Sequence, residues 1–423
     1  MKQSTIPFKT RKDAPKDEVS LNAQLLIQAG FIHKEMSGVY SMLPLGLRTF
    51  EKIKTIIRDE MLGLGASEVS LTTLQDKNLW EKSGRWNDEV VDNWFKTTLK
   101  NGTELGLGFS HEEPLTAMLR DHISSYKDLP VSVFQFQTKF RNELRAKSGI
   151  MRGREFLMKD LYSFSSTPEA HAEFYDRAKD AYIRIFDKVG LGKVTFPVQS
   201  SGGSFSKFSL EFQTITDAGE DIIYVDHDKK VGINKEIMSD EVCAEFGLNK
   251  SDLKEVKAVE VGNIFNLGTK YSDVLGLNYK DESGARIPVV MGCYGIGIGR
   301  LMGTIAEVFA DAKGLVWPKS VAPFDIHLIA LPDSDGMVMS ATEKIYEVLC
   351  DSAKSAKMPI NVLFDDRELG AGAKFADADL IGIPTRIVVG SKSLAEGKVE
   401  IINRQTGEAT QINITDISSY LHG

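Results

Sequence analysis

The sequence predicts an α+β domain in residues 1–318 followed by an α/β domain in residues 319–423. Residues 134–164 read as two strands joined by a basic loop, the pattern of an antiparallel hairpin. From residue 324 onward, strand-like and helix-like segments alternate, which predicts a parallel sheet covered on both sides. Between these regions, two prolines in GLVWPKSVAP (314–323) and a change in composition indicate a domain boundary.

The composition is typical of a globular protein, with 42% hydrophobic and 26% charged residues in a chain of 423. That length is enough for two or three domains with a buried core. The sequence has no long apolar run and no secretory signal, so we expect no membrane association. Cys243, Cys293 and Cys350 are widely spaced and form no CxxC pair, which favours a cytoplasmic location and argues against a zinc site.

The first domain begins with a polar arm (1–20) and a helical segment from Leu21. Apolar residues at three- and four-residue steps predict a helix of about five turns from Leu47 to Leu64. A strand is then predicted at residues 68–74. Glu112 and Glu113 precede the next helix, where acids often serve only as partners of the helix dipole.

The basic hairpin differs in charge from the rest of the chain. Seven Lys or Arg against three acids give residues 139–160 a charge of +4, whereas the whole chain carries −8. The loop could be a solvated hairpin tip. It could also bind a polyanion, because arginine forks grip phosphate oxygens in two-point contacts and an aromatic such as Phe156 can stack on a base.

The segments after the hairpin also carry signals of secondary structure. Thr167, Pro168 and Glu169 predict the start of a helix, residues 200–225 predict two strands, and the charged residues 226–258 predict a surface insertion or a short connector. In IPVVMGCYGIGIGR (287–300), glycines occupy alternate positions rather than the GxGxxG spacing of a dinucleotide-binding turn. This spacing predicts a strand with one bare face that a flat ligand can approach.

Predicted strands and helices alternate regularly in the second domain. We expect strands at 324–331, 359–366 and 385–390, helices at 340–357 and 374–382, and a hairpin at 398–414. Nine basic and fifteen acidic residues follow position 323, so −6 of the net charge lies here and charge alone does not predict RNA binding.

The basic hairpin, the proline-bearing first helix and the Gly-x-Gly-x-Gly-Arg segment together resemble the three motifs of class II aminoacyl-tRNA synthetases, in order and spacing. Over nearly its whole length the chain is similar to the bacterial-type prolyl-tRNA synthetases. The segments that carry this similarity are FRNE (140–143), GIMRGREFLMKDLYSF (149–164), EVGNIFNLGTKYS (260–272), MGCYGIGIGR (291–300), GLVWPKSVAPFDIHLI (314–329) and LIGIPTRIVVGSKSLAEGKVE (380–400).

The resemblance implies a catalytic antiparallel sheet flanked by helices and a C-terminal α/β anticodon-binding domain. It implies a homodimer formed through the first motif, around Gly38 to Met61 with Pro44 at its centre. It also implies activation of L-proline with ATP and Mg²⁺, followed by transfer to the terminal adenosine of tRNA(Pro).

Residue roles follow from the matched motifs. The resemblance implies that Arg141 contacts the α-phosphate of ATP and the proline carboxylate, and that Glu143 holds the adenine amino group. Arg152 and Arg300 should reach the γ-phosphate, with Arg300 and Phe156 on the two faces of adenine. The resemblance also implies that Gln213 contacts ATP or its ribose. The loop Ser110-His111-Glu112 should contact proline, and Glu112 should be the anion that holds the proline amine.

The sequence departs from the family at Ser110, Leu210, Asn263 and Gly299, where threonine, histidine, histidine and serine are common, and this leaves the shape of the proline pocket open. About 125 residues separate Phe164 from Met291, too few for the editing domain of about 180 residues that many members carry there. We therefore expect no editing of misactivated alanine in cis, and a free-standing editing protein as a partner.

Two other functions are compatible with part of this pattern. The first is that of a class II synthetase for threonine, serine, glycine or histidine. Zinc ligands of the threonyl enzymes and the histidine-binding signature of the histidyl enzymes are absent from the sequence. The second is that of a catalytically inactive paralogue that acts as an accessory subunit, which would usually have lost a catalytic arginine, whereas Arg141, Arg152 and Arg300 are all present.

Three residues of the second domain are candidate anticodon contacts, Asp366, Arg367 and Lys374, because they lie beyond the C-terminal ends of predicted strands. A solvated loop is the competing interpretation. No general base is recognisable beside Cys293, so a nucleophilic thiolate is not expected there.

Overall fold

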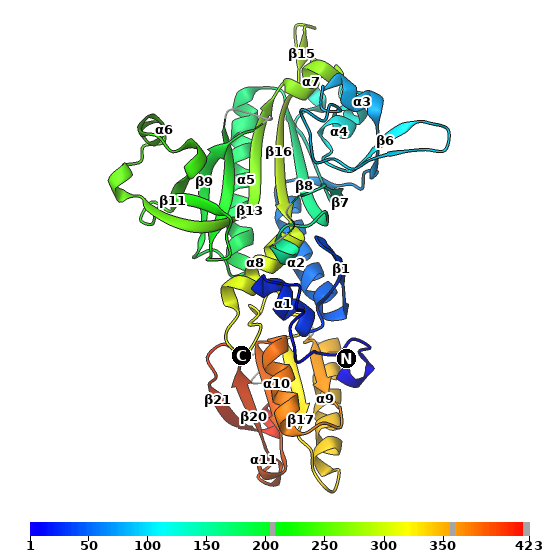
Figure 1. Ribbon diagram of the computed structural model, residues 1–423, viewed down its shortest axis with the longest axis vertical. Helices are drawn as coiled ribbons and strands as arrows, with labels where there is room; N and C mark the ends of the chain where they lie inside the picture. Colours follow the sequence, from blue (N-terminus) through cyan, green and yellow to red (C-terminus); the bar gives the residue numbers. More distant parts are fainter. Residues whose placement is uncertain (145, 147, 204–207, 356–359, 418–423) are drawn as a thin grey trace. The chain divides into compact units, whose positions relative to one another are not determined.

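The computed structural model describes residues 1–144, 146, 148–203, 208–355 and 360–417, with no side chains for 352–355. These residues form two units (Figure 1). The larger unit consists of Met36–Tyr40 and Ile53–Thr304, and the smaller of Met1–Glu35, Ser41–Lys52 and Ile305–Gly423. Arg145 and Lys147 of the basic loop lie outside the described residues.

A mostly antiparallel sheet of nine strands forms the centre of the larger unit, as predicted (Figure 1). Its order is β10-β9-β12-β11-β13-β16-β8-β7-β3, and β10 also pairs with β13. Among the described strands of this sheet, β9–β12 and β3–β7 are the parallel pairs. The strands are β3 (Ser67–Glu68), β7 (Val131–Phe140), β8 (Glu155–Ser165), β9 (Thr195–Ser201), β10 (Phe208–Ile215), β11 (Asp221–Asp226), β12 (Val231–Asn234), β13 (Lys254–Gly268) and β16 (Val290–Gly297).

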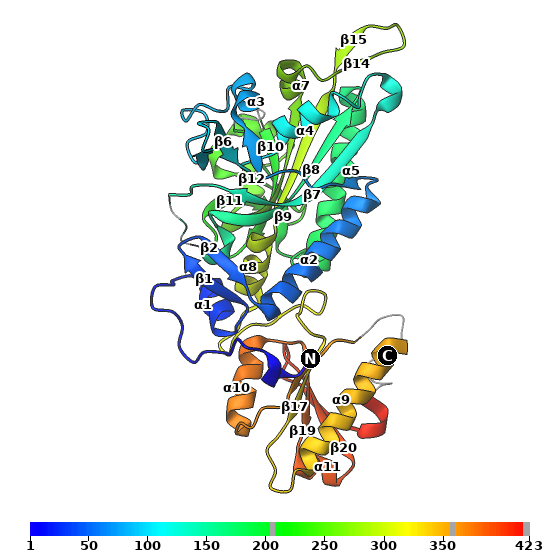
Figure 2. The ribbon, with the colours of Figure 1, turned by 90° about the vertical axis from the view of Figure 1, so that its right-hand side faces the viewer.

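Helix α5 (Pro168–Lys188) runs along one face of this sheet and packs on β8, β13 and β16 (Figure 2). It begins as predicted, since the Thr167 hydroxyl accepts a hydrogen bond from the Ala170 N–H. The larger unit also contains the helices α3 (Lys77–Lys82), α4 (Glu112–Leu119), α6 (Asp240–Glu245) and α7 (Lys270–Leu275). Helix α8 (Ile298–Phe309) is divided between the units after Thr304. The unit also contains two small sheets. One consists of β4 (Leu74–Asp76), β5 (Lys96–Thr98) and β6 (Glu104–Leu107), and the other consists of β14 (Asn278–Lys280) and β15 (Arg286–Pro288).

Two expectations for this unit need correction. The predicted strand 68–74 consists of the ends of two short strands, β3 and β4, which belong to different sheets. Residues 226–258 are not a surface insertion, because they contribute β12 to the interior of the main sheet and pack α6 on a small core of Ile233, Cys243 and Leu248. The many charged residues of this segment hide the few apolar positions that build this core.

The smaller unit contains a five-stranded sheet in the order β18-β17-β19-β20-β21. The first three strands are parallel, and β20 and β21 form the predicted hairpin. Figure 2 shows α9 and α10 on opposite sides of this sheet, as right-handed crossovers require. The elements are β17 (Ile326–Ala330), α9 (Met337–Ser355), β18 (Val362–Asp365), α10 (Ala371–Ile381), β19 (Thr385–Val389), α11 (Ser391–Ala395), β20 (Lys398–Asn403) and β21 (Ala409–Asn413).

The beginning of the chain also belongs to the smaller unit. It contributes α1 (Leu21–Gln28) and most of β1 (Ile32–Met36), which pairs with β2 (Val39–Met42). The tip of this hairpin, Met36–Tyr40, belongs to the larger unit, and α2 (Pro44–Gly63) is divided between the units after Lys52. The Phe364 N–H donates to the Met1 carbonyl at 2.9 Å, which attaches the arm to β18. This grouping differs from the predicted division at residue 318, because backbone pairing between distant segments leaves no mark in the sequence.

Candidate active site

A cavity of about 200 Å³ lies over β8, β13 and β16 in the larger unit. It is lined by Arg141 and Phe156 of the basic hairpin segment, by Arg300 of the Gly-x-Gly-x-Gly-Arg segment, and by Ser110 and Glu112 from the region of α4. The fold thus brings together side chains from five separate places in the chain, all of which were already singled out in the sequence. Gly295 and Gly297 also line the cavity, as expected for a strand with a bare face.

Arg141 follows β7 and is held between aromatic rings. Its guanidinium carbon lies 5.0 Å from the ring centre of Phe109 and 5.5 Å from that of Phe156. Its backbone N–H donates to the Arg154 carbonyl at 2.9 Å, which fixes the start of the loop. Burial and the neighbouring charge of Arg300 lower the pKa of Arg141, but a guanidinium stays protonated at neutral pH.

Arg300 lies in the first turn of α8 and connects two segments of the cavity wall. Its Nε–H donates to the Met151 carbonyl at 2.8 Å. Its Nη1 donates to the carbonyl and the carboxylate of Glu260, at 3.1 and 2.9 Å. The side chain keeps 32% of its surface exposed and lines the cavity, so part of the cation still faces a ligand.

Glu143 and Arg152 are paired with each other. Arg152 donates to Glu143 Oε2 through Nε at 3.0 Å and Nη2 at 2.9 Å, and its Nη1 donates to Glu220 at 2.6 Å. The Arg152 side chain is 40% exposed. The two groups predicted to hold opposite ends of ATP thus neutralise one another here, and a nucleotide would have to replace this pairing.

Glu112 is a fully buried carboxylate with three supporting donors. Its Oε2 lies 3.2 Å from Arg85 Nη1, and its Oε1 accepts the Cys293 thiol hydrogen with a sulfur–oxygen distance of 3.3 Å. Burial opposes ionisation, but the charge of Arg85 and a hydrogen bond from Ser110 outweigh it and lower the pKa of Glu112. Glu112 therefore presents a negative charge to the cavity at neutral pH.

Arg85 was not singled out in the sequence. It is 3% exposed, and its Nη1 also lies 3.1 Å from Glu113 and from the Tyr271 hydroxyl. The guanidinium stacks over Trp80 at 4.7 Å. An isolated arginine in an irregular aromatic segment carries no local signal, so only the folded chain identifies it as the partner of Glu112.

Asp160 is a second buried carboxylate at this cavity, also missed in the sequence. Its Oδ2 accepts hydrogen bonds from Lys139 Nζ at 2.8 Å, Gln135 Nε2 at 2.9 Å and the Tyr162 hydroxyl at 2.9 Å. The Lys139 charge outweighs the effect of burial and lowers the pKa of Asp160. Lys139 itself was counted only as part of the basic loop.

Three buried polar atoms of cavity-lining residues have no hydrogen-bond partner in the part of the chain that the structure describes. They are Arg141 Nε, Asp160 Oδ1 and Asn263 Oδ1. The Asn263 amide nitrogen donates to Glu260 Oε1 at 2.9 Å, which leaves its oxygen as an acceptor. One cationic donor and two acceptors match a ligand that carries both a carboxylate and an ammonium group.

Gln213 does not line the cavity. It is fully buried in β10, and its amide nitrogen donates to Glu211 Oε2 and Asp221 Oδ2, both at 2.8 Å. Burial and the neighbouring Glu260 raise the pKa of Glu211 to about 7. Gln213 orients two carboxylates in this geometry, and its Oε1 has no partner among the described residues, so its contact with ATP or the ribose stays a prediction.

The residues that depart from the family pattern fit the packing around them. Leu210 is 6% exposed and pairs with Ile264 on the next strand. A Cβ at Gly299 would lie 3.3 Å from the Ile150 carbonyl, a tight contact. Burial, followed by the nearby charge of Glu112, raises the pKa of Cys293, so the thiol stays protonated and serves as a donor rather than a nucleophile.

Pro44 is the first residue of α2, where proline is favoured. Nearby, Leu47 is 48% exposed. In the smaller unit, Asp366 accepts two hydrogen bonds from Ser4, and Arg367 is ion-paired with Asp365 and Asp377. Lys374 is 1% exposed, and its ammonium donates to the Ala330 carbonyl at 2.7 Å, so it supports the loop from within.

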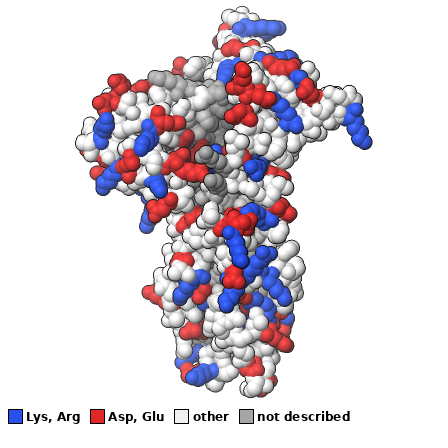
Figure 3. All heavy atoms as spheres, viewed as in Figure 1, with Lys and Arg blue, Asp and Glu red and all other residues white. Residues whose placement is uncertain are grey.

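Among the described residues, no group of three or more His, Cys, Asp or Glu is placed to hold a metal ion. The described helices include none that combines the length and apolar character needed to cross a bilayer. Acidic and basic side chains are interspersed on the face drawn in Figure 3. A polyanion would therefore be recognised through local groups rather than a field of one sign.

Family comparisons agree with this geometry. Residues 95–309 match the tRNA synthetase class II core domain (G, H, P, S and T), and residues 321–423 match an anticodon binding domain. A proline–tRNA ligase of Caulobacter vibrioides is 38% identical over 96% of both chains. One from Hyphomonas neptunium is 35% identical over the full length of both.

One of the relatives is considerably longer than this chain. The alignment with the proline–tRNA ligase of Exiguobacterium sibiricum is 32% identical and spans 566 positions, 143 more than this chain has residues. Among solved structures, a prolyl-tRNA synthetase from Cryptosporidium parvum complexed with halofuginone and AMPPNP has a TM-score of 0.78 at 18% identity. It covers 95% of this chain and 76% of the other, and at this identity it supports the fold alone.

Proposed function

Because the chain belongs to the proline–tRNA ligase family of the class II aminoacyl-tRNA synthetases, we propose that it joins L-proline to tRNA(Pro) in two steps. The proline carboxylate first attacks the α-phosphate of ATP, which yields prolyl-adenylate and diphosphate. The terminal adenosine of the tRNA then takes the prolyl group, and AMP leaves. The convergence of Arg141, Glu112 and Arg300 on one cavity is the observation that carries this proposal.

Arg141 is the group that serves the activation step. Two anions approach each other when a carboxylate attacks a phosphate, so a fixed cation between them stabilises the transition state. Arg141 has a free Nε–H, and Phe109 and Phe156 hold its guanidinium in place. No side-chain nucleophile is required, because holding the two reactants in line supplies most of the remaining acceleration.

The proline amine is assigned to the acidic end of the cavity. A prolyl ammonium group has two N–H donors, and Glu112 offers a charged oxygen beside Ser110. Asp160 Oδ1 and Asn263 Oδ1 are the acceptors with no partner among the described residues, and they supply further contacts in the same cavity. A secondary ammonium placed there satisfies buried polar atoms that otherwise cost free energy.

ATP is assigned to the outer part of the cavity, where Phe156 and Arg300 would flank adenine and Glu143 would accept from its amino group. Arg152 would move from Glu143 to the γ-phosphate, which can form charge-assisted hydrogen bonds of the same kind. Mg²⁺ would enter with ATP as part of the substrate, held by phosphate oxygens and one or two carboxylates such as Glu260.

Editing and assembly are proposed on separate grounds. The stretch between the second and third motifs forms strands β9 to β13 of the main sheet rather than a separate editing domain. We therefore propose that a free-standing editing protein hydrolyses alanyl-tRNA(Pro). We propose a homodimer through residues 38–61, supported by the exposed Leu47 on α2. Sedimentation equilibrium tests the dimer. The reaction belongs to the cytoplasm, where tRNA and ATP meet.

The proposed activation step is tested by amino-acid-dependent ATP–pyrophosphate exchange. Proline, alanine, threonine, serine and glycine are compared, with Arg141→Ala as the inactive control. We expect proline to drive exchange best and the variant to lose it. A folded protein that supports exchange with none of these amino acids would contradict the enzyme assignment and favour an accessory subunit.

A further inference from the structure

His111 lies between two residues assigned to proline, but its own side chain does not line the catalytic cavity. Ser110 and Glu112 both line that cavity. The imidazole of His111 is fully buried instead and makes its hydrogen bonds to β7 and to the segment between β3 and β4. The ring therefore has no part in the chemistry assigned above, and its contacts need a separate explanation.

Both ring nitrogens of His111 are hydrogen-bonded. Nε2 lies 3.0 Å from the carbonyl oxygen of Thr72, which can only accept, so Nε2 carries the hydrogen. Nδ1 is then the acceptor for the ammonium of Lys139, at 2.6 Å. Burial and the charge of Lys139 lower the pKa of His111 to about 4, so the ring stays neutral near pH 7. The neutral ring is thus a fixed bridge from Thr72 to Lys139.

Lys139 extends this bridge to Asp160 on β8. Its Nζ donates to Asp160 Oδ2 at 2.8 Å, and both side chains are buried. A second route passes through the Tyr162 hydroxyl, which accepts from the His111 backbone N–H at 3.1 Å and donates to Asp160 Oδ2 at 2.9 Å. The loop before α4 is therefore tied twice to one carboxylate oxygen. Such a network holds one geometry, because breaking any of its bonds leaves a buried polar atom unpaired.

The network fixes the relation between two carboxylates that line the catalytic cavity. Glu112 is the first residue of α4 and follows His111 directly, whereas Asp160 belongs to β8. The network uses Asp160 Oδ2 and leaves Oδ1, which has no partner among the described residues. The two carboxylates come from different elements, so the spacing between them depends on the buried side chains that join those elements.

We propose that His111 and Lys139 are positioning residues for the selection of proline. Their link holds Glu112 and Asp160 at the spacing that the two N–H groups of a secondary ammonium require. The pyrrolidine ring fixes the directions of those N–H groups relative to the carboxylate of the substrate, whereas the primary ammonium of alanine can rotate. A displaced carboxylate therefore costs proline more than alanine. This inference rests on the proposed function, which assigns both carboxylates to the substrate amine.

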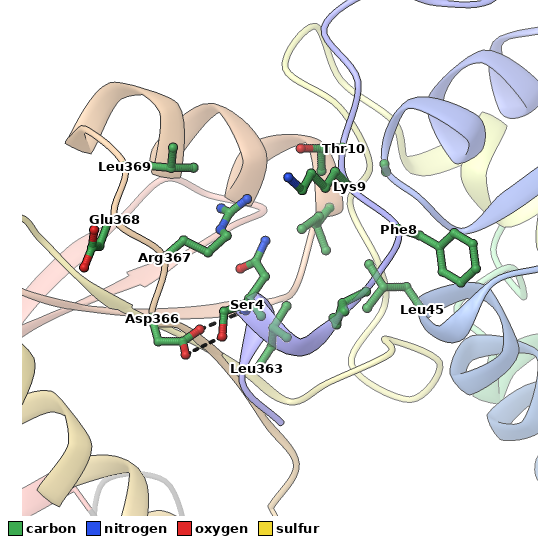
Figure 4. A pocket seen from close by; sticks show the side chains of 14 residues that line it. Ser4, Phe8, Lys9, Thr10, Leu45, Leu363, Asp366, Arg367, Glu368 and Leu369 are labelled. Carbon is green, nitrogen blue, oxygen red and sulfur yellow. Dashed lines mark hydrogen bonds between the residues drawn. The ribbon is translucent and has the colours of Figure 1, made fainter.

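The smaller unit provides a matched control, because none of its residues lines the catalytic cavity. A cavity of about 490 Å³ lies there, and polar groups around it are paired with one another (Figure 4). Asp366 accepts the two hydrogen bonds from Ser4 that are dashed in Figure 4. His327 is 1% exposed, and its Nε2 lies 3.0 Å from Gln3 Oε1. Replacing His327 therefore removes a buried, hydrogen-bonded histidine without touching the proline site.

Amino-acid-dependent pyrophosphate exchange tests the proposal with three substitutions of His111. His111→Leu removes both ring contacts at similar volume, His111→Asn keeps an acceptor for Lys139, and His111→Gln offers an acceptor and a donor. We expect the leucine variant to raise the KM for proline about 10–100-fold, the asparagine variant about threefold or more, and the glutamine variant less than about threefold. The KM for ATP should stay the same in all three, and His327→Leu should change neither constant.

The ratio of kcat/KM for proline to that for alanine is a second readout, which a general loss of stability would not change. It should fall several-fold in the leucine and asparagine variants and be kept in the glutamine variant. A wild-type KM for proline and a wild-type ratio in His111→Asn would overturn the proposal, even if His111→Leu did not fold. Equal increases in the KM values for proline and ATP would overturn it as well. Absence of proline-dependent exchange in the wild type would instead overturn the proposed function.

Discussion

At the scale of single residues, the catalytic cavity is organised by charges that are buried and paired. Glu112 keeps its charge because Arg85 lies 3.2 Å away, and Asp160 keeps its charge because Lys139 lies 2.8 Å away. Removing one member of such a pair leaves an uncompensated charge, which is strongly destabilising. Conservative substitutions that keep shape and hydrogen bonding are therefore the informative ones.

Replacing Glu112 with glutamine should weaken proline binding specifically. The change removes the charge that faces the substrate amine, so the KM for proline should rise about 10–100-fold in the exchange assay, while the KM for ATP stays the same. Glu113→Gln is the matched control, because Glu113 also contacts Arg85 but does not line the cavity. Equal effects of the two substitutions would argue against direct contact between Glu112 and proline.

Lys159 predicts an unusual dependence of stability on pH. It is fully buried against the Tyr182 hydroxyl at 2.5 Å, and burial lowers its pKa to about 7. The unfolded chain, with an ordinary lysine pKa, binds this proton more tightly, so the free energy of unfolding should rise between pH 7 and pH 9. The slope approaches about 1.4 kcal/mol per pH unit at most.

Urea denaturation at several pH values measures this slope. Lys159→Met should be at least as stable as the wild type at pH 7 and should lose most of the rise. Lys179→Met, at a partly exposed position on the same helix as Tyr182, should keep it. A wild-type slope identical to that of the Lys159 variant would show that Lys159 is protonated in the folded state.

At the scale of elements, the β7–β8 hairpin carries Glu143 and Arg152, the residues proposed to hold the two ends of the nucleotide. Arg152→Ala should raise the KM for ATP about tenfold, the value of one charge-assisted contact, and leave the KM for proline unchanged. Steady-state exchange at varied ATP and proline measures both constants, with Lys179→Ala as the control. An equal rise in both constants would mean that the substitution disturbs the whole loop rather than a phosphate contact.

The elements that the sequence predicted well are those with a strong local pattern. The cap and first-turn proline of α5, the alternation of β7 and the strand–helix order of the smaller unit all follow from residues close together in the chain. The residues that the motif matches assign to ATP and proline line the cavity, Gln213 excepted. Arg85 and Asp160 were not identified from the sequence, because their places at the cavity depend on contacts between distant segments, which no local pattern records.

At the scale of the whole molecule, the chain has Arg141, Arg152 and Arg300 of the matched motifs and a short stretch between the second and third motifs. Residues 219–258 build strands of the main sheet and the small core around Ile233. Discrimination between proline and alanine then depends on the pocket alone, and a difference of a few apolar atoms limits it to about 10–200-fold.

The purified protein should therefore form alanyl-tRNA(Pro) and leave it intact. Incubating preformed alanyl-tRNA(Pro) with the enzyme should give the rate of spontaneous deacylation, and kcat/KM for alanine in exchange should lie about 10–200-fold below that for proline. Enzyme-dependent hydrolysis that survives Arg141→Ala would reveal an editing site within this chain.

Charging of tRNA(Pro) with labelled proline is the decisive test of whether this chain is a proline–tRNA ligase. The assay is run with and without ATP, with tRNA(Ala) as the RNA control and Arg141→Ala as the protein control. We predict ATP-dependent formation of prolyl-tRNA(Pro), with no product in either control. Proline-dependent exchange without charging of tRNA(Pro), or charging that persists in the Arg141 variant, would contradict the account.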